Sequence, residues 1–164
     1  MVFLIVHAVA GVAVVVAIVL ANRQAFLRPV AGPKVSVLEG VYYIAGVVSV
    51  ILGWFFNIRF VGEYGRGILH NPIWGPGSWT EFILLGYDNP AAASASQDYT
   101  IMSVVLFPPY VIVDGRRRGI RRAWMYLLLI LTTSSAFAWA FYLATAERQR
   151  RAVGAAPSAA PMPA

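Results

Sequence analysis

Asp98 is the residue with the most scope for chemistry, because it is a carboxylate close to the start of a long uncharged stretch. Gln97 precedes it and supplies an amide next to the carboxylate. At mid-membrane an unpaired carboxylate costs about 2.5–3.5 kcal/mol, so it needs a partner or water. Two interpretations follow: a polar or proton-linked site between helices, or an interfacial carboxylate bonded to Arg59, Arg66 or a loop amide. We favour the second.

Histidine and cysteine chemistry is sparse in this sequence. There are no cysteines, which excludes disulfides, thiolate nucleophiles and cysteine-bound metal centres. Only two histidines occur, and His7 lies inside an apolar run, where we expect a hydrogen bond to a neighbouring helix rather than haem or metal ligation. We therefore predict no catalytic residue, no cofactor and no metal site.

Five arginines occur within seven residues between two apolar runs. We call Arg116, Arg117, Arg118, Arg121 and Arg122 the arginine cluster. Dense positive charge is hard to translocate, so the pattern predicts a short cytoplasmic connection between two membrane spans. Each such arginine gains about 1 kcal/mol from anionic lipid. Contact with a phospholipid headgroup or an acidic partner is the further expectation here.

The composition predicts an all-α integral membrane protein. Of 164 residues, 59% are hydrophobic and 12% charged, against about 25% charged in soluble domains. The net charge of +6 comes from basic residues beside apolar runs, which favours topology signals and lipid contact over nucleic-acid binding. We expect one membrane domain over 1–151 and a disordered Ala/Pro tail over 152–164.

Four transmembrane helices are predicted, over about 2–21, 38–60, 90–113 and 123–146. A secretory signal peptide is the rival interpretation of the first, but no lysine or arginine precedes it.

Several local patterns support these helices. Ser36 with Glu39 forms a capping box before the second span, with Glu39 expected to act as a cap or as a partner of the arginine cluster. Gly46, Ser49 and Gly53 recur near helical spacing and would let another helix approach closely. The third span opens on an Asn-Pro pair and carries a Pro-Pro pair at 108–109, which predicts a kink or an early end to regular helix.

The connection over 57–97 is rich in turn residues. Ser78 and Glu81 match a second capping box, which predicts a short interfacial helix anchored by Trp74 and Trp79.

The distribution of positive charge predicts the orientation. With both termini outside, the cytoplasmic connections carry eight positive charges and the opposite side five. This arrangement leaves three arginines outside, Arg148, Arg150 and Arg151, which counts against it. Positive charge in a tight loop, however, has more influence on orientation than positive charge in a terminal tail.

The stretch over 79–151 resembles a bacterial family of small, uncharacterised integral membrane proteins. The resemblance is carried by Asn89-Pro90-Ala91-Ala92-Ala93-Ser94, Asp98, Asp114-Gly115-Arg116-Arg117, Gly119 and Trp124. The usual form in the family looks like three spans, so this chain has an extra N-terminal helix, and Asp114 stands where glutamate is commoner. The resemblance implies a helical hairpin but no activity.

No catalytic constellation stands out, while small and aromatic positions suited to helix contacts are numerous. The leading expectation is a non-catalytic accessory or stabilising subunit of a larger membrane complex, in contact with membrane lipids and other integral membrane subunits. The alternatives are a membrane enzyme or carrier for an apolar lipid or isoprenoid, with the segment from Trp74 to Trp79 as a lid, or an oligomeric transporter.

Overall fold

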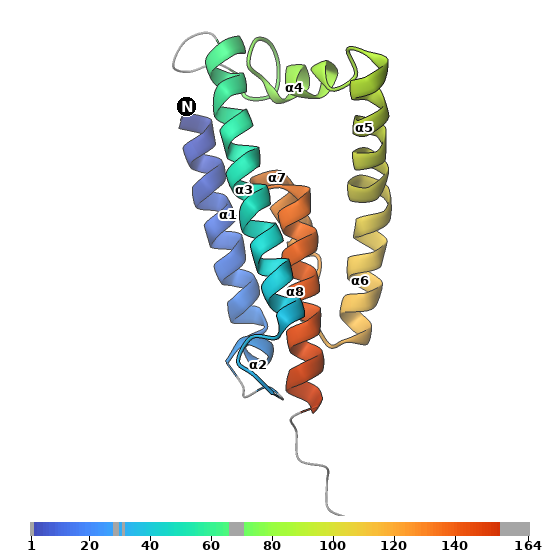
Figure 1. Cartoon of the computed structure of the whole chain (residues 1–164). Coiled ribbons are helices and arrows are strands. Elements are labelled where there is room, and N and C mark those ends of the chain that lie inside the picture. The colour runs from blue at the N-terminus through green and yellow to red at the C-terminus, as the bar shows by residue number, and fades with distance from the viewer. Residues whose placement is uncertain (1, 28–29, 31, 66–70, 155–164) are drawn as a thin grey trace, which may run out of the picture.

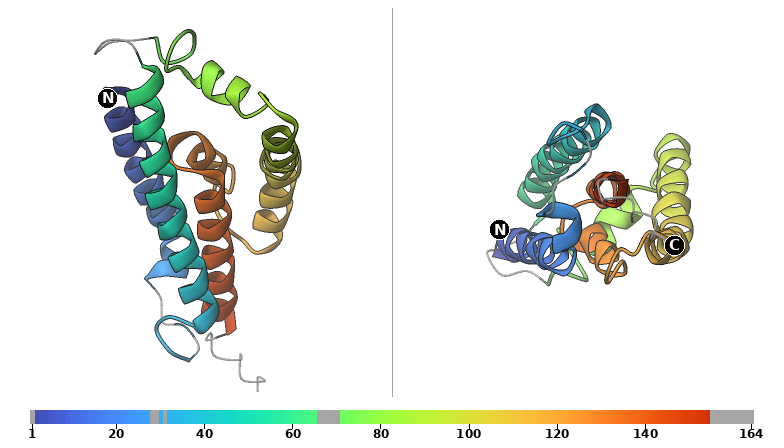
Figure 2. Two further views of the ribbon diagram at one scale, coloured as in Figure 1. Left: turned by 45° about the horizontal axis from the view of Figure 1, so that its top comes forward. Right: turned by 90° about the horizontal axis from the view of Figure 1, so that it is seen from below.

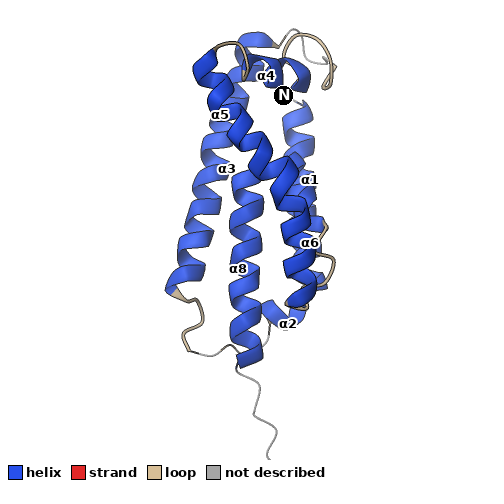
Figure 3. Ribbon diagram, turned by 90° about the vertical axis from the view of Figure 1, so that its right-hand side faces the viewer, coloured by secondary structure: helices blue, strands red, loops and turns tan. Residues whose placement is uncertain are grey.

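The computed structural model describes residues 2–27, 30, 32–65 and 71–154, and within these ranges all regular structure is helical (Figure 3). The elements are α1 (Val2–Ala21), α2 (Arg23–Phe26), α3 (Val37–Tyr64), α4 (Trp79–Leu85), α5 (Pro90–Thr100), the π-helical segment η1 (Ile101–Leu106), α6 (Phe107–Arg117), α7 (Met125–Thr132) and α8 (Ser135–Gly154). The all-α prediction is confirmed. The tail beyond 154, Arg28, Arg66 and His70 lie outside the described residues.

Two of the described helices are long and apolar enough to cross a bilayer. They are Phe3–Ala21, within α1, and Val37–Tyr64, which is α3. Few of their residues are buried inside the protein, and a row of valine, isoleucine and phenylalanine side chains is exposed along both. Such large exposed apolar surfaces are foreign to soluble monomers. Membrane insertion of these two helices is therefore the simplest account of their composition.

The capping box predicted before the second span is present and sets the start of α3. The Ser36 hydroxyl accepts from the Glu39 amide at 3.1 Å, and the Glu39 carboxylate accepts from the Ser36 amide at 3.1 Å. From there α3 rises beside α8 (Figure 1). Gly46 allows this approach, because a Cβ there would lie 3.2 Å from the Phe137 ring. Ser49 bonds Ser134 at 2.6 Å, whereas Gly53 faces open space.

The short helix predicted between the second and third spans is α4. It lies across one end of the molecule between the ends of α3 and α5 (Figures 1 and 2). The Ser78 hydroxyl caps it by accepting from the Glu81 amide, and Trp74 and Trp79 are both largely exposed. We call this end of the molecule the α4 end, and the opposite end the arginine end.

The third predicted span is a continuous rod of α5, η1 and α6. The Asn89 side chain caps α5 by accepting from two amides, and Pro90 occupies its first turn. The predicted interruption takes the form of the π-helical turn at Ile101–Leu106, directly before the proline pair. Proline lacks the amide hydrogen that a regular helix needs there, and a π-turn accommodates the loss. The rod continues to Arg117, beyond the predicted end at 113.

The single helix predicted over 123–146 is wrong, because this segment folds into two helices, α7 and α8. The Thr132 and Thr133 hydroxyls donate to the carbonyls of Leu128 and Leu129, and the Ser134 hydroxyl accepts from the Phe137 amide. The Ser134 hydroxyl thus serves as the acceptor for a backbone amide at the start of α8, while the Thr133 hydroxyl adds to the bond that the Thr133 amide already makes with the Leu129 carbonyl. α7 rises to about the middle of the molecule, and α8 returns to the arginine end (Figure 1).

This reversal places the two ends of the described chain at opposite ends of the molecule. α1 starts at the α4 end, and α8 finishes at the arginine end (Figure 1). The prediction that both termini share one side does not hold for this arrangement. The aromatic core lies where α6, α7 and α8 meet: Phe107, Tyr126 and Tyr142 are fully buried, and the Tyr142 ring contacts the rings of the other two.

Candidate functional site: an uncharged cavity below α4

A cavity of about 790 Å³ lies in the half of the molecule nearest α4. α1, α3 and α5 contribute its walls, α4 its roof, and the turn between α7 and α8 its floor. Small-molecule sites commonly measure about 300–1,000 Å³ and are mainly apolar with a few placed polar groups. The cavity fits that description in both size and lining.

The floor exists because α7 ends halfway up the molecule. Thr132, Thr133 and Ser134 line the cavity there. α1 packs tightly against this turn at Gly11, where a Cβ would lie 2.7 Å from a Thr133 methyl carbon. α3 holds it from the other side through the bond between Ser49 and Ser134. The turn is therefore half-buried between α1 and α3, and its side chains line the cavity.

The roof is tied to α5 by side chains around the turn after α4. The Ser96 hydroxyl donates to the Gly86 carbonyl at 2.7 Å, and the Tyr87 and Thr100 hydroxyls bond at 3.0 Å. The Glu81 carboxylate accepts from the Gly77 amide at 2.6 Å, which fixes the loop leading into α4. These bonds hold α4 over the cavity and keep α5 in place as its far wall.

Two polar side chains stand on the walls above the floor. His7 lies one helical turn from Gly11 on α1, and Asn57 lies two turns from Ser49 on α3, which puts them about 6 Å and 12 Å above the floor. The His7 Nδ1 bonds its own helix at the Phe3 carbonyl, 2.7 Å away. The predicted bond from His7 to a neighbouring helix is thus wrong, because a carbonyl one turn back satisfies the ring nitrogen.

No aspartate, glutamate, lysine or arginine is among the described residues that line the cavity. Its polar character comes only from hydroxyls, amides, indoles, phenols and one imidazole. Asp98, the leading candidate from the sequence, lies outside it on the exposed face of α5, where its carboxylate accepts from the Gln97 amide at 2.6 Å. Arg59, an expected partner of Asp98, instead pairs with Glu63 at 3.0 Å.

The arginine cluster lies at the end of α6 and in the turns that follow. Arg118 pairs with Asp114 at 2.6 Å, while the other four side chains are exposed. The buried Asn22 fixes the turn by accepting from the Arg121 amide at 2.7 Å and donating to the Arg121 carbonyl. Asn22 was missed at the sequence level, since it looks like an ordinary residue after a span.

Asp114 joins the arginine cluster to the core. The Tyr142 hydroxyl donates to its carboxylate at 2.7 Å, on the oxygen that also accepts from Arg118. Burial alone raises the pKa of Asp114, but the hydrogen bonds from Arg118 and Tyr142 outweigh it and lower the pKa below its ordinary value. The carboxylate therefore stays charged at neutral pH and holds both partners.

A second polar cluster ties the start of α3 to the end of α8. Glu39 is completely buried and pairs with Arg148 at 2.9 Å and with Arg151. Arg148 also donates to the Ala25 carbonyl at 3.0 Å, and Arg151 to the Pro33 carbonyl. The predicted cap at Glu39 is confirmed, but its ionic partners come from the end of α8 and not from the arginine cluster.

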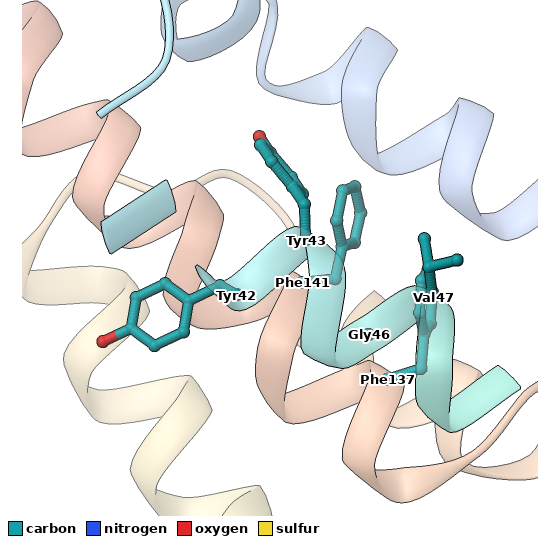
Figure 4. Close-up of a pocket in the computed structure, with 6 residues that line it drawn as sticks. All are labelled: Tyr42, Tyr43, Gly46, Val47, Phe137 and Phe141. Carbon is teal, nitrogen blue, oxygen red and sulfur yellow. The ribbon is translucent and has the colours of Figure 1, made fainter. Parts of the chain in front are cut away.

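A smaller apolar pocket of about 130 Å³ lies between α3 and α8 (Figure 4). Tyr42, Tyr43, Gly46, Val47, Phe137 and Phe141 line it. Its lining offers almost no polar surface that could orient a ligand, so it is a packing defect beside Gly46 rather than a site.

These features define a class of protein: a small, all-helical chain with membrane-length apolar helices and an uncharged cavity near one end. The chain belongs to the family described as Protein of unknown function DUF2834, whose family model matches residues 41–148. No curated protein and no solved structure matches it. The match includes α4, α5, α7 and nearly all of α3, but not α1, which supplies His7.

Proposed function

We propose that this protein binds an apolar small molecule taken from the membrane, and that the cavity below α4 is the binding site. The cavity is the observation that supports this function: it is large, its walls are mainly apolar, and several of its polar side chains are held in place by hydrogen bonds. Two of its walls, α1 and α3, belong to helices with exposed apolar side chains along their length, which suits a ligand that is itself dissolved in the bilayer. The proposed role is binding rather than catalysis.

The proposed site can be tested with a variant in which a larger side chain on α3 fills the cavity. Gly53 lines the cavity and a Cβ there meets nothing within 4 Å, so Gly53→Phe places a ring into open space. Gly62→Phe is the matched control, because Gly62 lies on the same helix, has equally open surroundings and is outside the cavity lining. Native mass spectrometry of protein extracted gently from its own membrane reports what remains bound.

We expect a bound apolar compound with the unmodified protein and with Gly62→Phe, and its loss with Gly53→Phe. Equal occupancy in both variants, or no bound compound in the unmodified protein, would refute the proposed site. Circular dichroism of both variants checks that the helices form.

The orientation that we propose has the arginine end in the cytoplasm. Ten of the eleven described lysine and arginine residues lie in elements at that end, and Arg59 is the exception. This asymmetry is the positive-inside pattern, and it puts the end of α8 in the cytoplasm and the start of α1 outside. Because the chain has no cysteine, single-cysteine variants at the exposed residues Val153 and Asp88 report each side. An impermeant thiol reagent on intact cells should label Asp88→Cys only; labelling of Val153→Cys would reverse the assignment.

Membership of a larger membrane complex is the second candidate, and the exposed Asp98 favours it. A carboxylate on the outer face of a bilayer-crossing rod, with one amide as its partner, is costly in lipid. A neighbouring subunit that donates to Asp98 would remove the cost. We expect gentle purification to yield a stoichiometric integral membrane partner that Asp98→Asn weakens; an unchanged monomer in both cases would count against this role.

A further inference from the structure

The cavity ligand is constrained first by charge. None of the described lining residues is an aspartate, glutamate, lysine or arginine. The acidic residues Glu63, Glu81 and Asp88 lie at the same end, and the described arginine there, Arg59, is already paired with Glu63. A phosphate or carboxylate headgroup would find no cation in the cavity and negative charge around it. Electrostatics therefore favours an uncharged ligand.

His7 adds a requirement for a hydrogen-bond donor. Its Nδ1 faces a backbone carbonyl, which can only accept, so Nδ1 carries the hydrogen. In the neutral ring the remaining nitrogen, Nε2, is then an acceptor. A ligand group that satisfies it must offer an O–H or N–H.

Asn57 supplies complementary groups on the α3 wall. Its side chain lines the cavity and is half-buried, and no hydrogen bond to it occurs within the described part of the chain. The amide offers two N–H donors and one carbonyl acceptor. Polar groups in an apolar wall gain most from a partner when no other protein group competes for them.

The floor hydroxyls extend the same preference. Thr132 and Thr133 have each donated their hydrogen to a carbonyl one turn back, at 2.9 Å and 2.6 Å. Their oxygens retain only acceptor capacity toward the cavity. The floor hydroxyls and His7 therefore both need a hydrogen-bond donor from the ligand, whereas Asn57 can donate and accept hydrogen bonds.

We infer that the cavity ligand is an uncharged lipid alcohol, whose hydroxyl group lies between His7 and Asn57 while its hydrocarbon body fills the apolar remainder of the cavity. A hydroxyl donates to an imidazole nitrogen and accepts from an amide, whereas an ether or a ketone oxygen can only accept. The inference rests on the binding function proposed above and adds the class of ligand.

Three probes separate the possibilities: geranylgeraniol, its methyl ether and geranylgeranyl phosphate. Each is added at matched mole fraction to the protein in phosphatidylcholine nanodiscs, and binding is followed by tryptophan fluorescence, because Trp54 and Trp79 line the cavity. We expect the alcohol to bind about tenfold more tightly than the ether, which is the scale of one well-placed hydrogen bond. The phosphate should bind more weakly than the alcohol.

His7→Phe, which removes the acceptor that only the alcohol can use, should reduce the preference for alcohol over ether to about twofold. Asn57→Leu, which removes the amide donor that both oxygens can accept from, should weaken the binding of both probes. His7→Gln, which restores an acceptor, should recover part of the preference. If all three probes bind alike, or the phosphate binds best, the inference is overturned while the cavity remains a binding site. If Gly53→Phe leaves the binding of every probe unchanged, the proposed function itself fails.

Discussion

Replacing Glu39 by glutamine tests whether the buried ion cluster holds α3 to α8. Glu39 is 0% exposed, and the side chains of its partners Arg148 and Arg151 are 16% and 5% exposed. Glutamine keeps an oxygen for the Ser36 amide, so the cap survives while the charge is removed. Arg148 then loses its ion pair with the buried carboxylate, and Arg151 loses one of its partners. Breaking a buried pair from one side typically costs 3–5 kcal/mol.

For a chain of this length, 1 kcal/mol corresponds to about 2–4 °C in melting temperature, so Glu39→Gln should lower the midpoint by roughly 6–20 °C. The assay is thermal unfolding in a fixed detergent, followed by circular dichroism. Glu63→Gln is the matched control, because it makes the same change in an exposed pair with Arg59 on the same helix, where the loss is about 0.3–0.5 kcal/mol. Equal shifts in the two variants would show that the cluster does not couple α3 to α8.

Three further changes probe the arginine end. Asp114→Asn should destabilise the protein at pH 7, and this loss of stability should shrink below about pH 4. The pKa of Asp114 is lower in the folded protein than in the unfolded chain, where it is about 3.9, so its stabilising effect is present above the unfolded pKa and is lost as the pH falls through the folded pKa. Melting temperatures measured over a range of pH test this. Gly115→Val should cost about 1–3 kcal/mol by overpacking, since a Cβ there would lie 2.6 Å from that of Ala123, whereas Gly40→Val, in open space, should cost little. Asn22→Ala should cost about 1–3 kcal/mol and raise protease sensitivity in the arginine cluster, because it leaves a backbone amide there unpaired.

Much of the fold could be predicted from the sequence because a capping residue at the start of several helices indicates where each of them begins. Ser36 with Glu39, Ser78, and Asn89 all cap the helices expected of them. Hydrophobic length identified α1 and α3 for the same reason, since length and apolarity are properties of a segment alone. The proline pair signalled the interruption that became η1.

The break between α7 and α8 could not be predicted from hydropathy, because the whole segment is uncharged and the reversal depends on tertiary partners. A run of four hydroxyl residues at 132–135 was the available signal. It was ambiguous, since threonine and serine also bond to their own helix without breaking it. Contacts from Gly11 and Ser49, distant in sequence, decide the outcome.

The candidate site was harder to predict for the same reason. His7 was noticed as a polar residue in an apolar run, but Asn57 was not, because an amide near the end of a span resembles an interfacial residue. Asp98 was conspicuous by charge, yet it lies outside the cavity. The cavity exists because α7 stops short and α4 closes the opposite end, and although Ser78 and Gly86 mark the bounds of α4, no local pattern marked the end of α7.

The position of the two arginines that neutralise Glu39 has a consequence for biogenesis. They lie on α8, 109 and 112 residues after Glu39, so they are synthesised after α1 to α7. Until then the Glu39 carboxylate at the start of α3 lacks these two partners, and the ionic contact between α3 and α8 cannot form. Since chains begin to fold from the N-terminus during synthesis, α3 is formed long before the residues that neutralise its first turn.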